Sequence, residues 1–255
     1  MKVRHDNVMF FFRAKIRMIG DNNRDNNSDD ISDKICETIS NAIAEGALRP
    51  GMKVLDDVIA KHFGVSRTVA RGVLSILERE HVIERRRNHG AFVSTPDKIE
   101  AEHLLEARRM LELAIVERAS RVASKQDLDQ LYAMTKDEET IHSSGDSAAQ
   151  KRLAGNFHIE LAKAAGNLVL VDSLKNVVAR LSLVAALYER QTAERCGADN
   201  HRQIIEALRS GDTKTAKDLM DDHLGDIEAS LDLSSPADQQ SSLSAILDKF
   251  APKSK

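Results

Sequence analysis

The spacing of proline is the feature that most constrains this fold. The four prolines stand at positions 50, 96, 236 and 252, so the long stretch between Pro96 and Pro236 contains none. Proline breaks helix interiors, because its ring clashes with the preceding turn and its nitrogen has no hydrogen to donate. Glycines divide this stretch into about six helical segments. The pattern predicts an all-α bundle.

Composition on either side of this block divides the chain into four parts. Residues 1–30 are predicted to be a flexible arm, because the run from Asp21 to Asp30 is too polar to bury. Residues 31–95 form a compact unit, and residues 97–232 form the helical domain. Residues 233–255 contain a Ser, Pro, Asp and Gln stretch that predicts a flexible tail.

The distribution of charge along the chain bears on the kind of partner that each domain binds. The chain carries a net charge of −3, so no global basic surface points to a nucleic-acid partner. Residues 31–95 nevertheless hold 10 Lys or Arg against 8 Asp or Glu, whereas residues 96–232 hold 18 against 25. A mildly basic unit joined to an acidic one suits a domain that binds a polyanion, coupled to a separate module.

Cysteine content and hydropathy bear on the compartment. Cys36 and Cys196 fit neither a disulfide framework nor a metal knuckle, which favours a reducing interior. The longest nearly unbroken apolar stretch, Leu181–Tyr188, is far shorter than the ~20 residues that a spanning helix needs. Residues 1–20 lack the apolar centre of a secretory signal. We therefore expect a cytoplasmic protein with no membrane partner.

Residues 31–79 carry the pattern of a helix-turn-helix. Apolar residues follow the helical period over residues 31–45, a short second helix is expected over residues 57–62, and Ser66 is placed as the N-cap of a third. On that third helix the predicted inward stripe is Val69, Val73, Ile76 and Leu77. The side chains predicted to face outward are Arg67, Thr68, Arg71 and Ser75. This geometry places the start of a helix in a DNA major groove.

A hairpin is predicted after the third helix. Residues 82–84 and 91–93 are short strand candidates that flank a cationic turn ending at His89 and Gly90. This is the wing of a winged helix. Arg86 is expected to lie along phosphates, while Arg67 and Arg71 are expected to contact guanine edges or neighbouring phosphates.

Three histidines of the helical block lie on apolar faces. The pattern places His158, His201 and His223 on the inward sides of three different helices. One such histidine is more often a packed core residue than a ligand. Three imidazoles that converge in one core form a transition-metal site with open positions. A metal-free bundle in which the histidines only pack stays as the alternative.

Arg108 is a charged residue on an apolar stripe. Its helix carries Leu104, Leu111 and Ile115 on the same face, so the guanidinium needs a buried anion. Two interpretations stay open here. Arg108 forms an internal ion pair with Glu112, or it binds the carboxylate of a ligand.

The predicted helix-turn-helix and hairpin of residues 31–95 resemble the DNA-binding domain of the GntR family of bacterial transcription regulators. Residues 65–74 read Val-Ser-Arg-Thr-Val-Ala-Arg-Gly-Val-Leu, similar to the family's Val-Ser-Arg-Thr-Pro-Val-Arg-Glu-Ala-Leu, with departures at Val69 and Gly72. The turn at residues 46–51 and the wing tip are similar too. In FadR-type members the matching positions contact operator DNA, and here these are Ser66, Arg67, Thr68, Arg71, His89 and Gly90. The resemblance also implies a homodimer on a two-fold operator.

The helical block resembles the FCD ligand-binding domain of the same branch. The resemblance is carried by stretches around Arg108, His158, His201 and His223. It implies that a divalent transition metal, in the first place Zn²⁺, is held by the three histidines, and that small organic acids bind through the metal and a nearby Arg. The family's Asp ligand, four residues before the first histidine, is Ala154 here. Water or the effector's own carboxylate would complete the coordination.

The expected fold is mainly α: a winged helix-turn-helix with a small β-hairpin wing, followed by an all-α bundle. The leading hypothesis is a ligand-responsive regulator of transcription that binds operator DNA as a dimer and a small carboxylate metabolite in the bundle. The alternative is a metal-dependent enzyme built on the three histidines with a nucleic-acid anchor. No recognisable motif places a catalytic base one turn from any of them, which favours the regulator.

Overall fold

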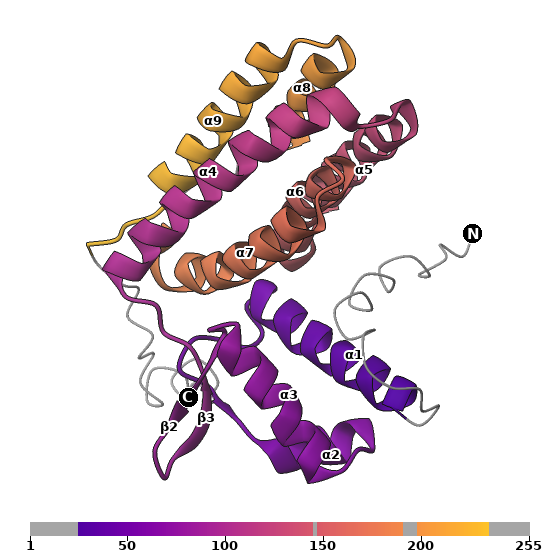
Figure 1. Ribbon diagram of the computed structural model, residues 1–255. Coiled ribbons are helices and arrows are strands. Elements are labelled where there is room, and N and C mark those ends of the chain that lie inside the picture. Colours follow the sequence, from indigo (N-terminus) through magenta and orange to yellow (C-terminus); the bar gives the residue numbers. More distant parts are fainter. Residues whose placement is uncertain (1–24, 145–146, 191–197, 235–255) are drawn as a thin grey trace, which may run out of the picture.

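The computed structural model of the protein describes residues 25–144, 147–190 and 198–234. Within these ranges an N-terminal domain of helices and a small sheet lies against a C-terminal helical bundle (Figure 1). The N-terminal elements are α1 (Asp25–Ala44), β1 (Lys53–Val54), α2 (Asp56–Phe63), α3 (Arg67–Arg79), β2 (Ile83–Arg86) and β3 (Gly90–Val93). The bundle comprises α4 (Lys98–Val122), α5 (Lys125–Ser144), α6 (Ser147–Ala164), α7 (Leu168–Tyr188), α8 (Ala198–Arg209) and α9 (Thr213–Ala229). The predicted fold class is confirmed.

The start of α1 corrects one prediction. The helix begins at Asp25, so the last six residues of the expected arm are helical, while residues 1–24 lie outside the described part. Acidic residues near a helix N-terminus interact favourably with the helix dipole, so a run of polar residues is compatible with the start of a helix. Polarity alone was therefore a poor guide to the boundary. Of the predicted tail, residues 235–255 also lie outside the described part.

The third helix forms as its cap and core residues dictate. The Ser66 Oγ accepts a hydrogen bond from the Val69 backbone N–H at 3.2 Å, as the N-cap prediction requires. Gly64 ends α2 with a φ of 65°, a left-handed conformation that favours glycine. The buried face of α3 consists of Ala70, Val73, Leu74 and Leu77. Val69 and Ile76, predicted to point fully inward, are half-buried at its edges.

The wing is a three-stranded antiparallel sheet in the order β1-β3-β2. Ile83 lies opposite Val93, and Arg86 lies opposite Gly90 at the end next to the connecting turn. The turn needs left-handed backbone, with φ of 62° at Asn88 and 99° at Gly90. The two predicted strands are confirmed, and β1 was missed because two residues are too few to show an alternating pattern.

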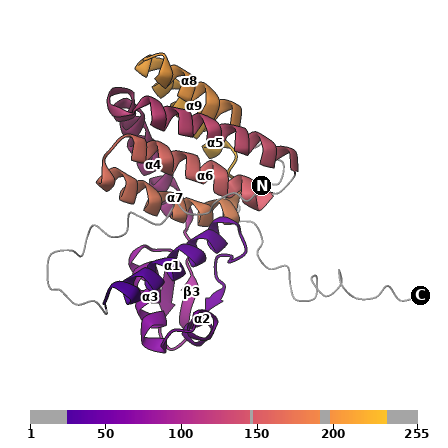
Figure 2. The ribbon, with the colours of Figure 1, turned by 90° about the vertical axis from the view of Figure 1, so that its right-hand side faces the viewer.

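Helix α7 connects the bundle to the N-terminal domain. It is the bundle helix nearest α1 in both views (Figures 1 and 2). Leu183 of α7 belongs to the buried apolar cluster of the N-terminal domain. The Asn176 Nδ2 donates to the Glu80 carbonyl at the end of α3 at 2.9 Å, and Arg152 of α6 pairs with Glu45 at 3.2 Å. The two domains therefore share packing as well as polar contacts.

No helix in the described part of the chain is long and apolar enough to cross a bilayer.

Candidate DNA-reading surface and metal-binding pocket

The outward face of α3 presents the predicted reading residues together. Arg67, Thr68, Arg71 and Ser75 are all exposed. Arg67 and Arg71 both pair with Asp56 at the start of α2, through Arg67 Nη2 to Oδ1 at 3.2 Å and Arg71 Nε to Oδ2 at 2.7 Å. The hydrogen bond from Arg71 is the main cause that lowers the pKa of Asp56. One carboxylate thus orients two guanidinium groups.

Asp56 is a functional candidate that sequence reasoning missed. Asp56 lies in the first turn of α2. An acidic residue is common in a first turn because its charge complements the helix dipole, so the sequence gives no reason to assign it a function. Its second role depends on how α2 crosses α3, which the local pattern does not encode.

The wing residues are also exposed, and some are tied back to the domain. The Arg86 guanidinium pairs with Glu84 at 2.6 Å and lies 4.4 Å from the centre of the Phe92 ring. Arg85, which the sequence did not single out, donates to the Ser75 hydroxyl at 2.8 Å and so links the wing to α3. His89 and Gly90 lie at the tip, as predicted.

The three predicted histidines converge in the bundle. His158 comes from α6, His201 from α8 and His223 from α9, and each residue is at most 2% exposed. The Nε2 of His223 lies 3.2 Å from the Nε2 of His201 and 3.3 Å from that of His158. Ligand nitrogens ~2.1 Å from a common Zn²⁺ would lie roughly 3.0–3.4 Å apart. The spacing of these side chains therefore fits a metal ion.

Buried carboxylates orient two of these rings. The Nδ1 of His158 donates to Glu112, and the Nδ1 of His201 donates to Glu138 Oε2 at 2.8 Å. A carboxylate on Nδ1 places the hydrogen there and leaves the Nε2 lone pair free for a metal. Glu138 was missed by sequence reasoning. The available signal was its spacing from Leu131 and Thr135, because residues 131, 135 and 138 share one helix face, which the structure shows to be buried.

The histidine ring charges also suit metal binding. Burial lowers the pKa of His158 to about 4 and that of His223 to about 2, so both rings are neutral near pH 7. Burial opposes ionisation of Glu112, but the charges of His158 and Arg108 outweigh it and lower the pKa of Glu112 to about 2. Neutral imidazoles and ionised carboxylates are the states that a metal site requires.

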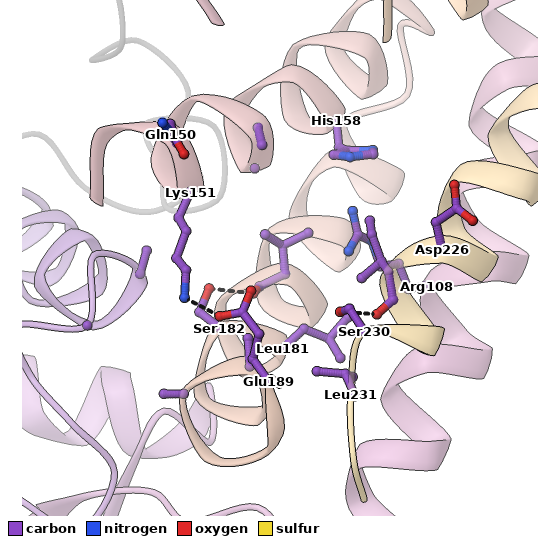
Figure 3. Close-up of a pocket in the computed structure, with 18 of the residues that line it drawn as sticks. Arg108, Gln150, Lys151, His158, Leu181, Ser182, Glu189, Asp226, Ser230 and Leu231 are labelled. Atoms are coloured by element: carbon purple, nitrogen blue, oxygen red, sulfur yellow. Dashed lines mark hydrogen bonds and ion pairs between the residues drawn. The ribbon is translucent and has the colours of Figure 1, made fainter. Parts of the chain in front are cut away.

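The position of Arg108 is compatible with both interpretations of this residue. Its Nε donates to Glu112 Oε1 at 2.6 Å, so the internal ion pair is present. It also lines a cavity of about 230 Å³ together with His158 and His223. Figure 3 shows the side chains of Arg108 and His158 directed into the same region of this cavity. The pair fixes the guanidinium beside the histidines.

The cavity reaches beyond the bundle core. Ala154 lines it one turn before His158, and Lys151 pairs with Glu189, the residue that follows α7, at 2.6 Å (Figure 3). Residues from the end of α1 and the turn after it, Ile43, Ala44 and Gly46, complete the wall. A ligand in this cavity would therefore lie against both domains.

Comparisons with known proteins agree with this architecture. The family model for bacterial regulatory proteins of the gntR family matches residues 31–93, and the model for the FCD domain matches residues 103–226. The Uxu operon regulator of Haemophilus influenzae is similar, with 29% identity over 209 residues, covering 74% of this chain and 77% of the relative. The HTH-type transcriptional regulator LutR of Bacillus subtilis is 28% identical over 210 residues, covering 73% and 94%.

A solved structure supports the fold. E. coli McbR/YncC matches with a TM-score of 0.70 and 17% identity, covering 78% of this chain and 95% of that one. Both relatives named above are regulators of transcription, so the alternative of a three-histidine enzyme finds no support in them. The chain belongs to the GntR family of bacterial regulatory proteins, in the branch with an FCD domain, and is a ligand-responsive DNA-binding regulator of transcription.

Proposed function

We propose that α3 and the wing bind operator DNA while the bundle cavity binds a small carboxylate effector at a divalent metal ion. The reading contacts are assigned to one exposed surface, formed by Ser66, Arg67, Thr68, Arg71, Arg86, His89 and Gly90. Arg67 and Arg71 project from the first turns of α3, where side chains reach base edges in a major groove. Arg86 and the wing tip lie along the phosphates.

The metal is assigned to His158, His201 and His223, and Zn²⁺ is the first choice because it favours imidazole nitrogen with open positions. When bound, the ion supplies a Lewis-acid centre that holds an oxygen ligand. Glu112 and Glu138 keep two rings oriented, as the Nδ1 contacts indicate. Arg108, held by Glu112, is placed to pair with an effector carboxylate.

The signal passes from the cavity to the reader through shared surfaces. The cavity wall includes Ala44, the last residue of α1, and α7 contacts the end of α3 through Asn176. An effector that binds one domain arrangement more tightly shifts the population toward it. We place the protein in the cytoplasm. We also propose that it is a homodimer, because a two-fold operator needs two DNA-binding domains.

The observation that carries this proposal is the cluster of three buried histidines, whose ligand nitrogens all lie within 4.8 Å of one another. Elemental analysis of protein from zinc-supplemented cells should find one Zn²⁺ per chain. The His201→Asn variant, which replaces one ligand by a smaller polar side chain, should lose most of it. Wild-type protein without stoichiometric metal, or a His201→Asn variant that retains it, would reject the metal assignment.

A further inference from the structure

One face of the wing sheet carries two cations around a single aromatic ring. In the antiparallel register, Lys53 of β1 and Glu84 of β2 both lie opposite Phe92 of β3, so these three side chains share that face. The Lys53 Nζ lies 5.8 Å from the centre of the Phe92 ring, and the Arg86 Cζ lies 4.4 Å from it. Both distances allow attraction between a cation and the face of the ring. Phe92 therefore holds two positive groups on one face of the wing.

The Lys53 side chain passes beside the wing tip. Its Cε lies 3.4 Å from the point that a Cβ would occupy at Gly90. Gly90 belongs to the tip that we assign to the phosphates, and it has no side chain that would displace the lysine stem. The end of the Lys53 side chain therefore lies next to the proposed DNA-binding surface, although β1 is not part of the hairpin.

The charge of Lys53 is available to a partner, unlike the charges of two arginines on β2. Arg86 pairs with Glu84 at 2.6 Å, and Arg85 pairs with Glu78 at 2.9 Å. No described residue forms an ion pair with Lys53, which is exposed. Binding of a phosphate by Lys53 therefore does not require an existing ion pair to break.

Lys53 and Arg86 project from the two edge strands of the sheet, because β1 and β2 lie on opposite sides of β3. Neighbouring strands are ~4.8 Å apart, so the backbones of β1 and β2 are separated by roughly 10 Å. The two side chains approach the Phe92 ring from opposite edges. This separation favours contacts to two different phosphates, so the two charges should contribute independently to DNA binding.

We propose that the DNA-binding surface of the wing extends onto β1, where Lys53 binds a backbone phosphate separate from the one bound by Arg86. The inference rests on the proposed assignment of the wing to operator phosphates. Phosphate contacts fix the orientation of a protein on the duplex and carry no sequence information. Lys53 therefore contributes to the affinity for any duplex and not to the choice of base.

The experiment measures the affinity of the full-length protein for DNA by fluorescence anisotropy between ~50 and ~200 mM salt, with a duplex selected from genomic fragments and a scrambled duplex. Each phosphate contact contributes about 0.9 to the slope of log affinity against log salt. Over this fourfold range of salt, Lys53→Gln should therefore lose about three- to fourfold less affinity than the wild type, on both duplexes alike. The double variant Lys53→Gln, Arg86→Gln should lose about tenfold less.

Two further variants are the controls. Lys53→Arg keeps the positive charge and should keep the wild-type slope. Lys125→Gln removes the same charge from an exposed position on α5, which lies away from the wing (Figure 1). This variant should also keep the wild-type slope, because salt screens the interaction of exposed charges beyond roughly 10 Å. Circular dichroism of each variant checks that the protein is folded.

Two results would overturn the role of Lys53 and leave the proposed function intact. One is a wild-type slope for Lys53→Gln while Arg86→Gln alone lowers the slope. The other is a loss of affinity in Lys53→Gln that is confined to the selected duplex, since a phosphate contact acts on every sequence. If neither Lys53→Gln nor Arg86→Gln changes the slope while the wild type binds DNA, the wing as a whole is not on the phosphates. If the wild type binds no duplex, the proposed DNA-binding function itself is wrong.

Discussion

At the scale of single residues, the two arginines that we propose contact DNA are already paired with a carboxylate in the protein alone. Asp56 accepts hydrogen bonds from both Arg67 and Arg71, although each arginine side chain is 63% exposed. An exposed ion pair contributes little to stability. Its value here is orientation, because bidentate contacts to guanine depend on the direction of the guanidinium plane.

Asp56→Asn should therefore reduce discrimination rather than simple affinity. Removing one negative charge from the DNA-facing surface raises affinity for any duplex, while loosened arginines lose affinity for the cognate site. We expect the ratio of specific to non-specific binding to fall about three- to tenfold, a modest part of the range that base contacts span. Fluorescence anisotropy with cognate and scrambled duplexes measures this ratio. Asp57→Asn, its neighbour in the sequence, is the control, and equal ratios for the two variants would contradict the role of Asp56.

The buried histidines predict how stability depends on pH. The pKa values of His158 and His223 are lowered in the folded protein from 6.5, to about 4 and about 2. As the pH falls below 6.5, the unfolded chain binds protons that the folded chain refuses, so stability present above 6.5 is lost. Each such histidine contributes a slope of about 1.4 kcal/mol per pH unit.

Urea unfolding of the metal-free protein between pH 7.5 and pH 4.5 tests this expectation. The pKa of Glu112 is lowered from 4.5, so its own contribution is lost only below this window. The His223→Gln variant should show a shallower slope than the wild type, because one titrating group is gone. A wild-type midpoint that stays constant across the window would contradict the inferred charge states.

At the residue scale, the sequence identified candidates where a polar or charged side chain lies on an otherwise apolar helix face. Three histidines and one arginine on apolar faces stood out. In the structure Arg108, His158 and His223 line one cavity, and His201 contacts His223 behind it. Asp56 and Glu138 did not stand out, because an acidic residue on a helix is ordinary until its contacts are known. Their roles depend on tertiary contacts across 15 and 63 positions.

At the scale of elements, α3 carries a glycine in its interior. Gly72 has an ordinary helical backbone, and nothing lies within 4 Å of the position that a Cβ would occupy. Glycine in a helix is less stable than alanine by roughly 0.5–1 kcal/mol, because more backbone freedom is lost on folding. Gly72 therefore makes α3 less stable than an alanine at the same position would make it.

Gly72→Ala should raise the free energy of unfolding of the N-terminal domain by about 0.5–1 kcal/mol. Gly64→Ala is the control, because that position is equally open but has a φ of 65°. A side chain is strained there, so this variant should lose stability. Chemical denaturation followed by circular dichroism compares the two, and a Gly72→Ala variant no more stable than the wild type would show that the glycine is needed for packing.

Element prediction succeeded for long periodic segments and failed at edges. The caps and periodicity identified α3 and the two wing strands, and Gly155 and Gly225 are interior to α6 and α9 as the block pattern allowed. The start of α1 and the strand β1 were missed. A helix end without apolar residues and a strand of two residues are set by neighbouring elements, which the local pattern does not contain.

At the scale of the whole molecule, the domain boundary lies inside a packed interface. Leu183 is on α7 of the bundle yet is buried in the core of the N-terminal domain. The sequence placed a boundary in the linker after residue 95 but contained no signal that a bundle residue would enter the other core. This shared packing connects the domain of the proposed effector site to the domain proposed to bind DNA, so a shift of α7 would be felt in the N-terminal core.

Leu183→Ala should destabilise the protein and separate the unfolding of its domains. Removing a buried leucine costs about 2–5 kcal/mol, because a cavity remains. Calorimetry should show one transition in the wild type and two in the variant. Leu168→Ala on the same helix is the control, since Leu168 is 48% exposed and its loss should leave the single transition intact. One transition at the same temperature for Leu183→Ala would contradict shared packing.

Sequence-specific DNA binding by α3 is the most direct test of the proposed function. Full-length protein should select, from fragments of the genome that encodes it, a small set of duplexes that share a two-fold-symmetric site. The double variant Arg67→Ala, Arg71→Ala should fold normally and lose about 1–3 kcal/mol of cognate affinity for each base-reading arginine. Selection of no common site by the wild type, or of the same site with equal affinity by the double variant, would contradict the account.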